Sequence, residues 1–444
     1  MSSKQGSRLA AELRRKITDR DARVGVIGLG YVGLPLAVEF AQAGFHVTGI
    51  DVSKKTVETV RAGRSHIADV PSEVVADLVR RRMLRAQSRY KGCGRCDVII
   101  ICVPTPLRKT KDPDISYIIN ALEKIAKEIR RGHLVVLEST TYPGTTEEVL
   151  RPRLEAGGLQ AGRDFFLAFS PERVDPGNQR FTTHNTPKVV GGTTPKCTEV
   201  AAHLYGQAVE SVHPVSSTQV AEMVKLLENT FRAVNIGLVN EIALMCDRLG
   251  LDVWEVIDGA ATKPFGFMRF YPGPGIGGHC IPLDPHYLSW KLKTLDYSAR
   301  FIELAAEING NMPFVVASKA TELLNRKKKS VNGSRVMILG VAYKRDTSDV
   351  RESPALDVLR LLMNRGAKVS FHDPYNSEIR IDGGGVSKVT PLTPANLKRA
   401  DLVVIVTDHS SYDYDMIVRH SSVVLDTRNA TRHVRAGRSK VHKL

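Results

Sequence analysis

The sequence predicts an α/β fold with two Rossmann-like, doubly wound domains joined by a helical connector domain. The segment that begins at Arg23 changes from a short β-branched strand to helical periodicity across a cluster of glycines. Further along, the apolar segments Val98–Val103 and Leu134–Glu138 alternate with amphipathic helices, which is typical of a parallel sheet covered on both faces. The same alternation starts again near Arg335 and indicates a second α/β unit.

The order of elements along the chain predicts three domains. After the first strand we expect a second strand at His46–Asp51 and helices through about residue 85. The segment from Ser217 to about Gly259 is almost purely helical and too apolar for a helix that faces solvent alone, so it either joins domains or packs against another subunit. A helix near 355–364 and strands at 368–372, 401–407 and 422–426 follow. The expected domains are therefore residues 1–213, 214–312 and 313–444.

Length and composition exclude several classes of protein. A chain of 444 residues exceeds the roughly 250–300 residues at which single cores split into domains. The net charge of +16 comes from dispersed basic residues without interleaved stacking aromatics, which argues against nucleic acid and for a phosphate-bearing substrate. No apolar run approaches the ~20 residues of a membrane helix, and the charged N-terminus lacks a signal core. We expect a cytoplasmic protein with neither a membrane nor a nucleic-acid partner.

The six cysteines indicate free thiols, since this long chain shows no sign of secretion. Cys93 and Cys96 form a C-x-x-C pair, which admits either a structural zinc or a simple loop before a strand. The pair has no second pair of ligands beside it in the sequence. The loop is therefore favoured and no metal is predicted.

A glycine-rich turn predicts a dinucleotide site. The motif Gly28-Leu-Gly-Tyr-Val-Gly33 lies between the first strand and the next helix. Gly28 permits the tight turn, Gly30 lets the backbone approach a pyrophosphate, and Gly33 allows close packing of helix and strand. Asp51 closes the second strand about 20 residues on, where a carboxylate accepts from a ribose 2′-OH and repels a 2′-phosphate. NAD is thus favoured over NADP, although Lys54 and Lys55 follow closely.

A second motif presents a thiol in a loop rich in glycine. The segment from Tyr271 to Asp284 reads Tyr-Pro-Gly-Pro-Gly-Ile-Gly-Gly-His-Cys-Ile-Pro-Leu-Asp. Substrate can approach Cys280 closely here, and backbone N–H groups can stabilise an oxyanion. A buried, inert cysteine is the common alternative, but the consecutive glycines beside Cys280 argue against it. His279 either lowers the pKa of the thiol or merely spaces the loop.

The chain resembles the UDP-glucose/GDP-mannose dehydrogenase family over essentially its whole length. Seven sequence blocks carry the resemblance, and together they are far more specific than any one of them. In chain order they are GLGYVGLPLA, ICVPTP, STTYPGTT, SPERVDPG, AEMVKLLEN, GGHCIPLD and GVAYKRDTSDVRESPA.

The resemblance implies a four-electron oxidation with NAD as cofactor. Hydride leaves the C6 carbinol of a UDP-sugar to give an aldehyde, which the Cys280 thiolate attacks. A second hydride transfer turns the resulting thiohemiacetal into a thioester, and water then releases the carboxylate. The covalent bond keeps the aldehyde from escaping between the two oxidations.

The same resemblance assigns the other catalytic groups. Lys225 would stabilise the developing oxyanion, with Asn229 hydrogen-bonding beside it. Asp284 and Thr141 would hold a water for proton transfer, and Glu172 would be the base in thioester hydrolysis. Taken alone, Lys225 and Asn229 at i, i+4 spacing read equally well as solvated helix residues. Their place in the ordered set of blocks favours the catalytic role.

The residues that the family uses for binding carry over from the same blocks. The expected cofactor-binding residues are Gly28, Gly30, Tyr31, Val32, Gly33, Asp51, Pro104, Thr105, Thr141 and Arg351. The expected substrate-binding residues are Glu172, Arg173, Lys225, Asn229, Tyr271, Gly277, Tyr343, Lys344 and Arg428. The first predicted domain would therefore bind NAD, the second would carry the Cys280 loop and a homodimer contact, and the third would bind the UDP-sugar.

Two positions depart from the family pattern. Thr56 stands where family members often have an arginine, so that Lys54 or Lys55 would take its place. The family's arginine from a neighbouring subunit has only Lys263 or Arg269 as counterparts.

The form of the Cys280 loop bears on the sugar. His279 before the thiol and the segment from Thr262 to Met268 resemble the branch of the family that acts on UDP-N-acetylhexosamines. The resemblance favours UDP-N-acetylglucosamine, in polysaccharide biosynthesis, with UDP-N-acetylgalactosamine and UDP-glucose as alternatives. Two other interpretations stay open: a two-electron dehydrogenase that needs no thiol, and a protein that binds NAD or UDP-sugars without turnover.

Overall fold

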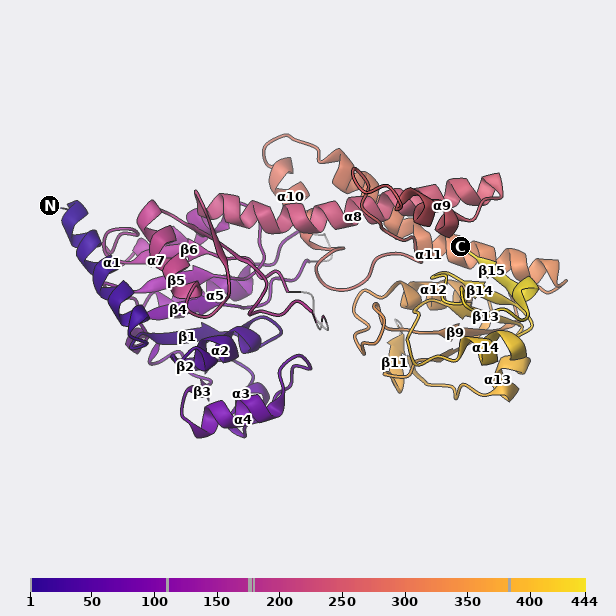
Figure 1. Cartoon of the computed structure of the whole chain (residues 1–444), viewed down its shortest axis with the longest axis horizontal. Helices are drawn as coiled ribbons and strands as arrows, with labels where there is room; N and C mark the ends of the chain where they lie inside the picture. Colours follow the sequence, from indigo (N-terminus) through magenta and orange to yellow (C-terminus); the bar gives the residue numbers. More distant parts are fainter. Residues whose placement is uncertain (1, 109–111, 175–177, 179, 382–384) are drawn as a thin grey trace. The chain divides into compact units, whose positions relative to one another are not determined.

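Figure 1 shows the computed structural model of the chain, which describes residues 2–108, 112–174, 178, 180–381 and 385–444. The last part of the SPERVDPG block, residues 175–177, lies outside the described residues. The chain divides into two compact units. Unit 1 comprises Met1–Glu228 and His286–Tyr297, and unit 2 comprises Asn229–Pro285 and Ser298–Leu444. No helix among the described residues is long and apolar enough to cross a membrane.

Unit 1 is built on an eight-stranded sheet in the order β3-β2-β1-β4-β5-β6-β7-β8. Neighbouring strands pair in parallel, except that β7 runs antiparallel to β6. The strands are β1 (Arg23–Ile27), β2 (His46–Ile50), β3 (Leu84–Gln87), β4 (Val98–Ile101), β5 (Leu134–Leu137), β6 (Phe166–Phe169), β7 (Lys188–Gly192) and β8 (Val212–Val215). The predicted parallel sheet is confirmed.

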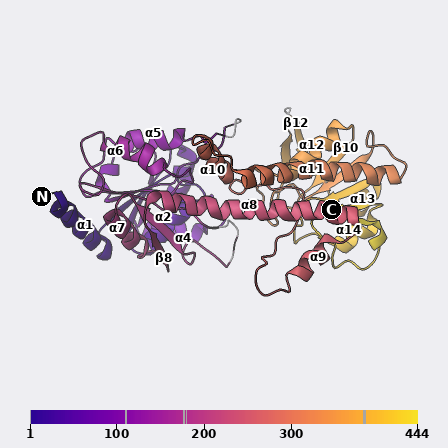
Figure 2. The same ribbon diagram turned by 90° about the horizontal axis from the view of Figure 1, so that it is seen from above.

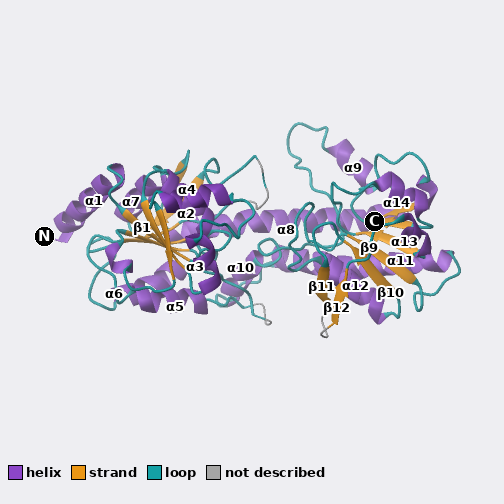
Figure 3. Ribbon diagram, turned by 90° about the horizontal axis from the view of Figure 1, so that it is seen from below, coloured by secondary structure: helices purple, strands orange, loops and turns teal. Residues whose placement is uncertain are grey.

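Helices cover both faces of this sheet, as Figure 3 shows. One face packs against α1 (Ser2–Thr18), α2 (Gly33–Gln42), α4 (Ser72–Arg80) and α7 (Pro195–Tyr205). The other face packs against α5 (Ser116–Ile125), the single π turn η2 (Thr146–Leu150) and α6 (Arg151–Glu155). The central strands β4, β5 and β6 are buried at every residue, because side chains on both of their faces enter one of these two cores.

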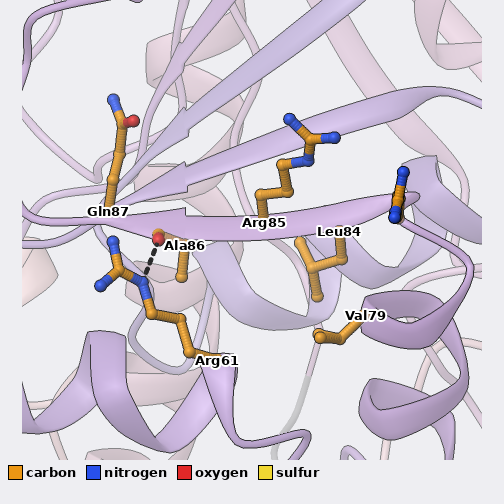
Figure 4. Close-up of a pocket in the computed structure, with 7 residues that line it drawn as sticks. Arg61, Val79, Leu84, Arg85, Ala86 and Gln87 are labelled. Carbon is orange, nitrogen blue, oxygen red and sulfur yellow. Dashed lines mark hydrogen bonds between the residues drawn. The ribbon is translucent and has the colours of Figure 1, made fainter.

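The edge of the sheet corrects one prediction. Helices were expected through about residue 85, but α4 ends at Arg80 and β3 begins at Leu84. Leu84 and Ala86 are buried while Arg85 is exposed, and Figure 4 shows Arg85 on the opposite side of the strand from Leu84. A strand of four residues gives too short an alternation to stand out from the helix before it. Helix α3 (Lys54–Arg61) precedes α4, and the 3-10 turn η1 (Cys93–Arg95) follows β3.

Unit 2 repeats the α/β plan on a five-stranded parallel sheet in the order β10-β9-β13-β14-β15. Its strands are β9 (Arg335–Leu339), β10 (Lys368–His372), β13 (Leu402–Ile405), β14 (Val424–Asp426) and β15 (Val441–Lys443), and β11 (Glu378–Ile381) pairs with β12 (Gly385–Lys388) apart from them. The associated helices are α12 (Pro354–Asn364), α13 (Pro394–Arg399), α14 (Tyr414–His420) and the turn η3 (Arg438–Lys440). The second Rossmann-like unit is confirmed.

Helical segments make up the rest of the chain. The predicted helical stretch forms α8 (Thr218–Leu249) and α9 (Val253–Ala260), and α10 (Asp284–Lys293) follows the Cys280 loop. In unit 2, α8 lies beside α11 (Arg300–Arg326), as Figure 2 shows. A side chain at Gly237 of α8 would come within 3.2 Å of the Cα of Ala305 on α11. The buried Asn240 side chain donates to Asn309 Oδ1 at 2.8 Å and so ties the two helices together.

The two α/β units share the turn after their first strand. In unit 1, Asp51 accepts from the backbone N–H groups of Leu29 and Ser53, each at 2.8 Å. In unit 2, Asp373 accepts from the backbone N–H groups of Val341 at 2.8 Å and Tyr375 at 2.9 Å. The aspartate that closes the second strand therefore fixes the turn after the first strand in both units.

The environment of Asp373 gives a stability prediction. Burial opposes ionisation of Asp373, but His409, 3.0 Å away, and the backbone N–H groups outweigh it and lower the pKa to about 2. The ionised carboxylate therefore stabilises the fold above the unfolded pKa, and this contribution is lost as the pH falls through 2.

We expect Asp373→Asn to lower the free energy of unfolding at pH 7 by about 1–2 kcal/mol, measured by urea denaturation. The difference from the unsubstituted chain should shrink between pH 4 and pH 2. The exposed Asp415 provides the control, because Asp415→Asn should change stability by less than about 0.5 kcal/mol. A difference that is the same at every pH would contradict the account.

Candidate active site

The predicted site residues of unit 1 follow the carboxyl ends of five parallel strands. The glycine turn follows β1, Asp51 follows β2, Thr105 follows β4, Thr141 follows β5 and Glu172 follows β6. Since these strands are mutually parallel, their carboxyl ends lie along one edge of the sheet. Open α/β sheets bind ligands at this edge.

The three glycines of the turn face three different surroundings. Gly28 has φ +89°, and a Cβ on it would lie 2.5 Å from the carbonyl oxygen of Cys102. A Cβ on Gly33 would collide with the carbonyl oxygen of Gly28 and come within 3.1 Å of the Cys102 side chain. Around Gly30, by contrast, no heavy atom lies within 4 Å of an added Cβ. The turn is thus closed on the protein side and open where a pyrophosphate would approach.

Asp51 retains acceptor capacity for a ribose. Its two oxygens each accept one backbone N–H, from Leu29 and from Ser53. A carboxylate offers about four lone-pair sites, so each oxygen can take another donor. Tyr31 is 55% exposed beside the turn, and Val32 begins α2. This donor and acceptor set fits a dinucleotide.

The loops after β4 and β5 are fixed from within unit 1. Pro104 is exposed, whereas Thr105 is buried and its carbonyl accepts the Tyr287 hydroxyl. Thr141 is buried, and its hydroxyl lies 2.7 Å from that of Thr145.

Glu222 of α8 anchors the residues that follow Thr141. Its carboxylate accepts from the backbone N–H groups of Gly144 at 2.6 Å and Thr146 at 2.9 Å. Burial raises the pKa of Glu222 to about 7 against the effect of these hydrogen bonds. The carboxylate lies one helical turn before Lys225, so it connects the Thr141 loop to the helix that carries this lysine.

Glu172 lies in a group of buried charges. Its Oε1 accepts from the backbone N–H groups of Arg173 and Val174, each at 2.8 Å, and its Oε2 accepts from Lys188 Nζ at 3.0 Å. Burial raises the pKa of Glu172, but the charge of Lys188, the Val174 N–H and the charge of Lys225 outweigh it and hold the pKa below its usual value. Glu172 is therefore an ionised acceptor at neutral pH.

Two further predicted residues of unit 1 lie beside Glu172. Arg173 donates to the backbone carbonyl of Pro187 at 2.7 Å and to Glu228 Oε1 at 2.5 Å. Lys225 is 8% exposed, and its charge acts on the Glu172 carboxylate. Unit 1 thus brings Glu172, Arg173 and Lys225 into one region.

The Cys280 loop belongs to unit 2, and its glycines have a reason that the sequence did not reveal. A Cβ on Gly277 would lie 2.6 Å from the Cβ of Tyr343, and one on Gly278 would lie 2.7 Å from the Tyr343 ring. Gly278 has φ +88°, and its N–H donates to the carbonyl of Arg351 at 3.0 Å. The glycines let the thiol loop pack against the Tyr343–Arg351 segment, in addition to any approach by substrate.

Asn229 and Asp284 meet within unit 2. The Asn229 amide donates to Asp284 Oδ2 at 2.5 Å, and both residues are nearly fully buried. The backbone N–H of Asp284 donates to the carbonyl of Cys280 at 2.8 Å. The hydrogen-bonded Asn229 and Asp284 are therefore tied to the backbone of the cysteine itself.

The surroundings of His279 disfavour its protonated form. Burial and the charge of Arg351 lower its pKa, against the opposite effect of Asp349. A lowered pKa leaves less of the positive charge that would stabilise a thiolate, and both interpretations of His279 stay predictions.

The predicted phosphate-binding residues of unit 2 follow the carboxyl ends of β9 and β14. Tyr343 and Lys344 follow β9, and Arg428 follows β14 and donates to the carbonyl of Val406 at 3.1 Å. Arg351 pairs with Asp349 at 2.6 Å in its own loop. Tyr271 donates to Asp258 at 2.5 Å. All of these residues lie in unit 2, and their roles in binding substrate or cofactor stay predictions.

Arg269 and Lys263, the two residues considered for a partner subunit's site, have neighbours within their own chain. Arg269 lies 3.2 Å from the Tyr271 hydroxyl and 3.8 Å from Asp258. The Lys263 ammonium lies over the Phe265 ring.

The cysteines separate into two kinds. Cys280 alone is exposed among the six, all of which lie in the described part of the chain. Cys93 and Cys96 enter the apolar core between the sheet and α5, and burial raises their pKa values to about 12 and 11. The loop interpretation of this C-x-x-C pair fits these surroundings.

A pocket of about 330 Å³ lies at the edge strand β3, and Figure 4 shows its lining. Arg61 donates to the carbonyl of Ala86 at 2.8 Å and so closes one side of it. The lining contains none of the predicted site residues; it consists of Arg61, Val79, Arg82, Leu84, Arg85, Ala86 and Gln87.

Comparison with known proteins matches three successive segments of the chain to one family. Residues 22–209 match the NAD binding domain of the UDP-glucose/GDP-mannose dehydrogenase family, residues 219–311 match its central domain, and residues 337–433 match its UDP binding domain. A UDP-N-acetyl-D-glucosamine 6-dehydrogenase of Pseudomonas aeruginosa is 35% identical over 88% of this chain and 92% of that protein. A UDP-N-acetyl-D-mannosamine dehydrogenase of Pyrococcus horikoshii is 36% identical over 92% of this chain and 95% of that protein. A solved UDP-D-ManNAc dehydrogenase from Pyrococcus horikoshii superposes with a TM-score of 0.85 at 35% identity, covering 94% of this chain and 97% of the other.

The fold and the glycine turn define an NAD-dependent dehydrogenase with a second α/β unit for a nucleotide-bearing substrate. The chain belongs to the UDP-glucose/GDP-mannose dehydrogenase family. Its cofactor is NAD, and its substrate is a UDP-sugar.

Burial predicts how the six thiols react with iodoacetamide at pH 8. Cys280 should be alkylated first, and Cys93 and Cys96 should react at least about 100-fold more slowly, because their raised pKa values leave little thiolate. Peptide mapping by mass spectrometry over time measures the order. Urea-unfolded chain, in which all six thiols should react alike, is the control. Alkylation of Cys93 or Cys96 at the rate of Cys280 in the folded chain would contradict the structure.

Proposed function

We propose that the chain oxidises the C6 hydroxyl of UDP-N-acetylglucosamine to the uronic acid in two NAD-dependent steps, through a thiohemiacetal and a thioester on Cys280. The observation that carries the proposal is the exposed Cys280, held on a glycine loop whose backbone is bonded to the buried Asp284–Asn229 pair. A two-electron dehydrogenase has no use for such a thiol. A protein that only binds nucleotides has no use for the buried ionised groups around Glu172.

Cys280 is the proposed nucleophile. Its sulfur adds to the C6 aldehyde, and the C–S bond persists while the second hydride leaves C6. The backbone N–H of Asp284 is bonded to the carbonyl of Cys280, and the proposed role of the Asp284 carboxylate is to accept a proton through a water. The Asn229 amide, already bonded to Asp284, fixes the orientation of that carboxylate.

The unit 1 residues provide the charged groups. Lys225 is the proposed cation for the oxyanion that develops at C6. Glu172 is the proposed base that activates water for thioester hydrolysis, and its lowered pKa keeps it ready to accept a proton. Thr141 is proposed to hold water with Asp284.

NAD, when bound, accepts hydride from C6. The residues proposed to hold it in unit 1 are Gly28, Gly30, Tyr31, Val32, Gly33, Asp51, Pro104, Thr105 and Thr141, with Arg351 contributed by unit 2. Glu172, Arg173, Lys225, Asn229, Tyr271, Gly277, Tyr343, Lys344 and Arg428 are proposed to hold the UDP-sugar. The domain boundaries at 213 and 312, a cytoplasmic location and a role in polysaccharide biosynthesis remain part of this proposal.

The identity of the sugar is the most specific part of the proposal. The form of the Cys280 loop supports a UDP-N-acetylhexosamine, and the similar P. aeruginosa protein is described as acting on the glucosamine compound. A similar P. horikoshii protein is described as acting on the mannosamine compound, which therefore joins UDP-N-acetylgalactosamine and UDP-glucose as an alternative.

We also propose a homodimer through α8. Val220, Met223, Leu227, Phe231, Leu238, Met245 and Leu249 are exposed, and their spacing places them on one face of this helix. An exposed apolar stripe of this length marks a contact surface. Light scattering should give twice the 48.9 kDa chain mass, and a monomer at micromolar concentration would overturn the dimer.

The test of the proposed function is a panel of UDP-N-acetylglucosamine, UDP-N-acetylmannosamine, UDP-N-acetylgalactosamine and UDP-glucose with NAD. We expect two NADH per acid formed, the highest kcat/KM with UDP-N-acetylglucosamine, and a loss of at least ~10³-fold in Cys280→Ala. Cys246→Ala removes a buried thiol and is the matched control.

Each unexpected result overturns a defined part of the proposal. A preference for another sugar overturns the specificity and leaves the chemistry intact. One NADH per sugar with a fully active Cys280→Ala chain overturns the covalent mechanism. If the chain binds NAD but oxidises none of the four UDP-sugars, the result favours the non-catalytic interpretation.

A further inference from the structure

A buried lysine, Lys188, contacts the carboxylate of Glu172. It belongs to none of the seven sequence blocks. Lys188 begins β7 and is 3% exposed. Its ammonium donates to Glu172 Oε2 at 3.0 Å and to Glu138 Oε2 at 2.9 Å. Glu138 follows β5 and is fully buried, and its second oxygen accepts the hydroxyl of Tyr205 on α7. A single ammonium therefore bridges two carboxylates inside unit 1.

The charges around this ammonium do not cancel. With both carboxylates ionised, Lys188, Glu138 and Glu172 carry one positive and two negative charges. Burial raises the pKa of Glu138, while the two carboxylates raise the pKa of Lys188 against the effect of its burial. The other titratable groups that face the three are Tyr205, the buried Cys102 thiol and Lys225 on α8. Lys188 is therefore the cation that binds Glu172 most directly.

Three contacts hold the Glu172 carboxylate in one orientation. Its Oε1 is fixed by the backbone N–H groups of Arg173 and Val174, which belong to its own loop. Its Oε2 contacts Lys188, which the parallel pairing of β7 with β8 and the contact with Glu138 hold in the sheet. The N–H of Lys188 donates to the carbonyl of Ser211, so this residue cannot move without breaking the pairing of β7 with β8. Lys188 thus fixes the position of the Glu172 carboxylate relative to the sheet of unit 1.

We propose that Lys188 is a positioning residue for the reaction: it holds Glu172 ionised and oriented as the base that activates water, and Glu138 anchors Lys188 for this task. The proposal rests on the proposed function of Glu172. The step itself balances simply: Glu172 takes a proton from water as the water oxygen bonds to the thioester carbon, and the Cys280 sulfur leaves as thiolate.

A purely structural role makes a different prediction. A buried ion pair that only holds the fold together can often be replaced by apolar residues without loss of stability, provided that no charge is left unpaired. Lys188→Met alone leaves two buried carboxylates facing each other and is expected to destabilise the fold. Lys188→Met with Glu138→Gln restores the net charge of the group to its original value. If Lys188 has only a structural role, both stability and kcat should recover in the double variant. If it positions Glu172, stability should recover but kcat should not.

The test measures kcat against pH, thermal stability and NADH stoichiometry for Glu138→Gln, the double variant and the unsubstituted chain. In the double variant we expect recovered stability, a kcat lowered roughly 100-fold or more, and an acid limb of the kcat profile moved upward by about 1–3 pH units. The limb moves upward because Glu172 loses its main counter-charge and protonates at higher pH. The exposed Lys127 provides the control, since Lys127→Met should change neither the profile nor the stability.

Glu138→Gln keeps Lys188 and tests the proposal without the risk of misfolding. The ammonium then faces one carboxylate instead of two, so the acid limb should move to lower pH. A structural role predicts no movement in this variant and restored kcat in the double variant, and either result would overturn the proposal.

A direct measurement separates this proposal from the proposed function. Glutamate labelled with ¹³C at the carboxyl carbon gives the pKa of Glu172 by NMR, with Glu172→Gln used to assign the signal. The pKa should rise by about 1–3 units in the double variant whether or not the chain turns over a sugar. An unsubstituted chain that oxidises no UDP-sugar defeats the proposed function, whereas an unchanged Glu172 pKa defeats the role of Lys188.

Discussion

The parallel pairing of β1, β2, β4, β5 and β6 is the constraint on which the unit 1 site depends. These strands are short and mostly buried. Because they are parallel, all of them end at the same edge of the sheet, and a loop follows each strand there. Five loops from distant parts of the sequence consequently converge. The glycine turn, Asp51, Thr105, Thr141 and Glu172 come together because of strand direction, without any need for sequence proximity.

The second α/β unit uses the same turn but does not repeat the dinucleotide motif. Gly340 takes the place of Gly28, with φ +81° compared with +89°, and Asp373 takes the place of Asp51. Yet Ala342 stands where Gly30 lies, and His409 contacts the Asp373 carboxylate at 3.0 Å. The oxygen that would accept from a ribose is thus already engaged, and the backbone approach to a pyrophosphate carries a side chain. One architecture therefore serves two different ligands.

Much of this could be predicted from the sequence, for physical reasons that differ among residues. β4 and β5 are continuous apolar runs, and the glycines of the first turn have no other common use in a strand-to-helix junction. β3, β6, β7 and β8 are equally short but lack a run of β-branched residues. β3 carries the exposed Arg85, β6 reads Phe-Leu-Ala-Phe, β7 ends in two glycines and β8 contains Pro214. Motif position placed Asn229 and Asp284 among the catalytic residues, and the fold joins them by a hydrogen bond that the sequence did not predict.

The remaining parts of the site depend on contacts that have no local signature. Lys188 stands before an apolar strand, where a lysine ordinarily caps an exposed end, and only the fold buries it against Glu138 and Glu172. A carboxylate that closes an apolar strand, as Glu138 does, was the one available hint. Similarly, the reason for Gly277 and Gly278 lies in Tyr343, which is more than sixty residues away in the sequence.

In the proposed mechanism, Cys280 carries the sugar as a thioester while Glu172 activates the water that hydrolyses it. The most direct measurement is rapid-quench mass spectrometry of Glu172→Gln mixed with UDP-N-acetylglucosamine and NAD, followed by peptide mapping. A uronyl adduct should accumulate on the peptide that contains Cys280, since hydrolysis is slowed while both oxidations proceed. Formation of the uronic acid with no adduct on Cys280 at any time, or an adduct on one of the five buried cysteines, would contradict it.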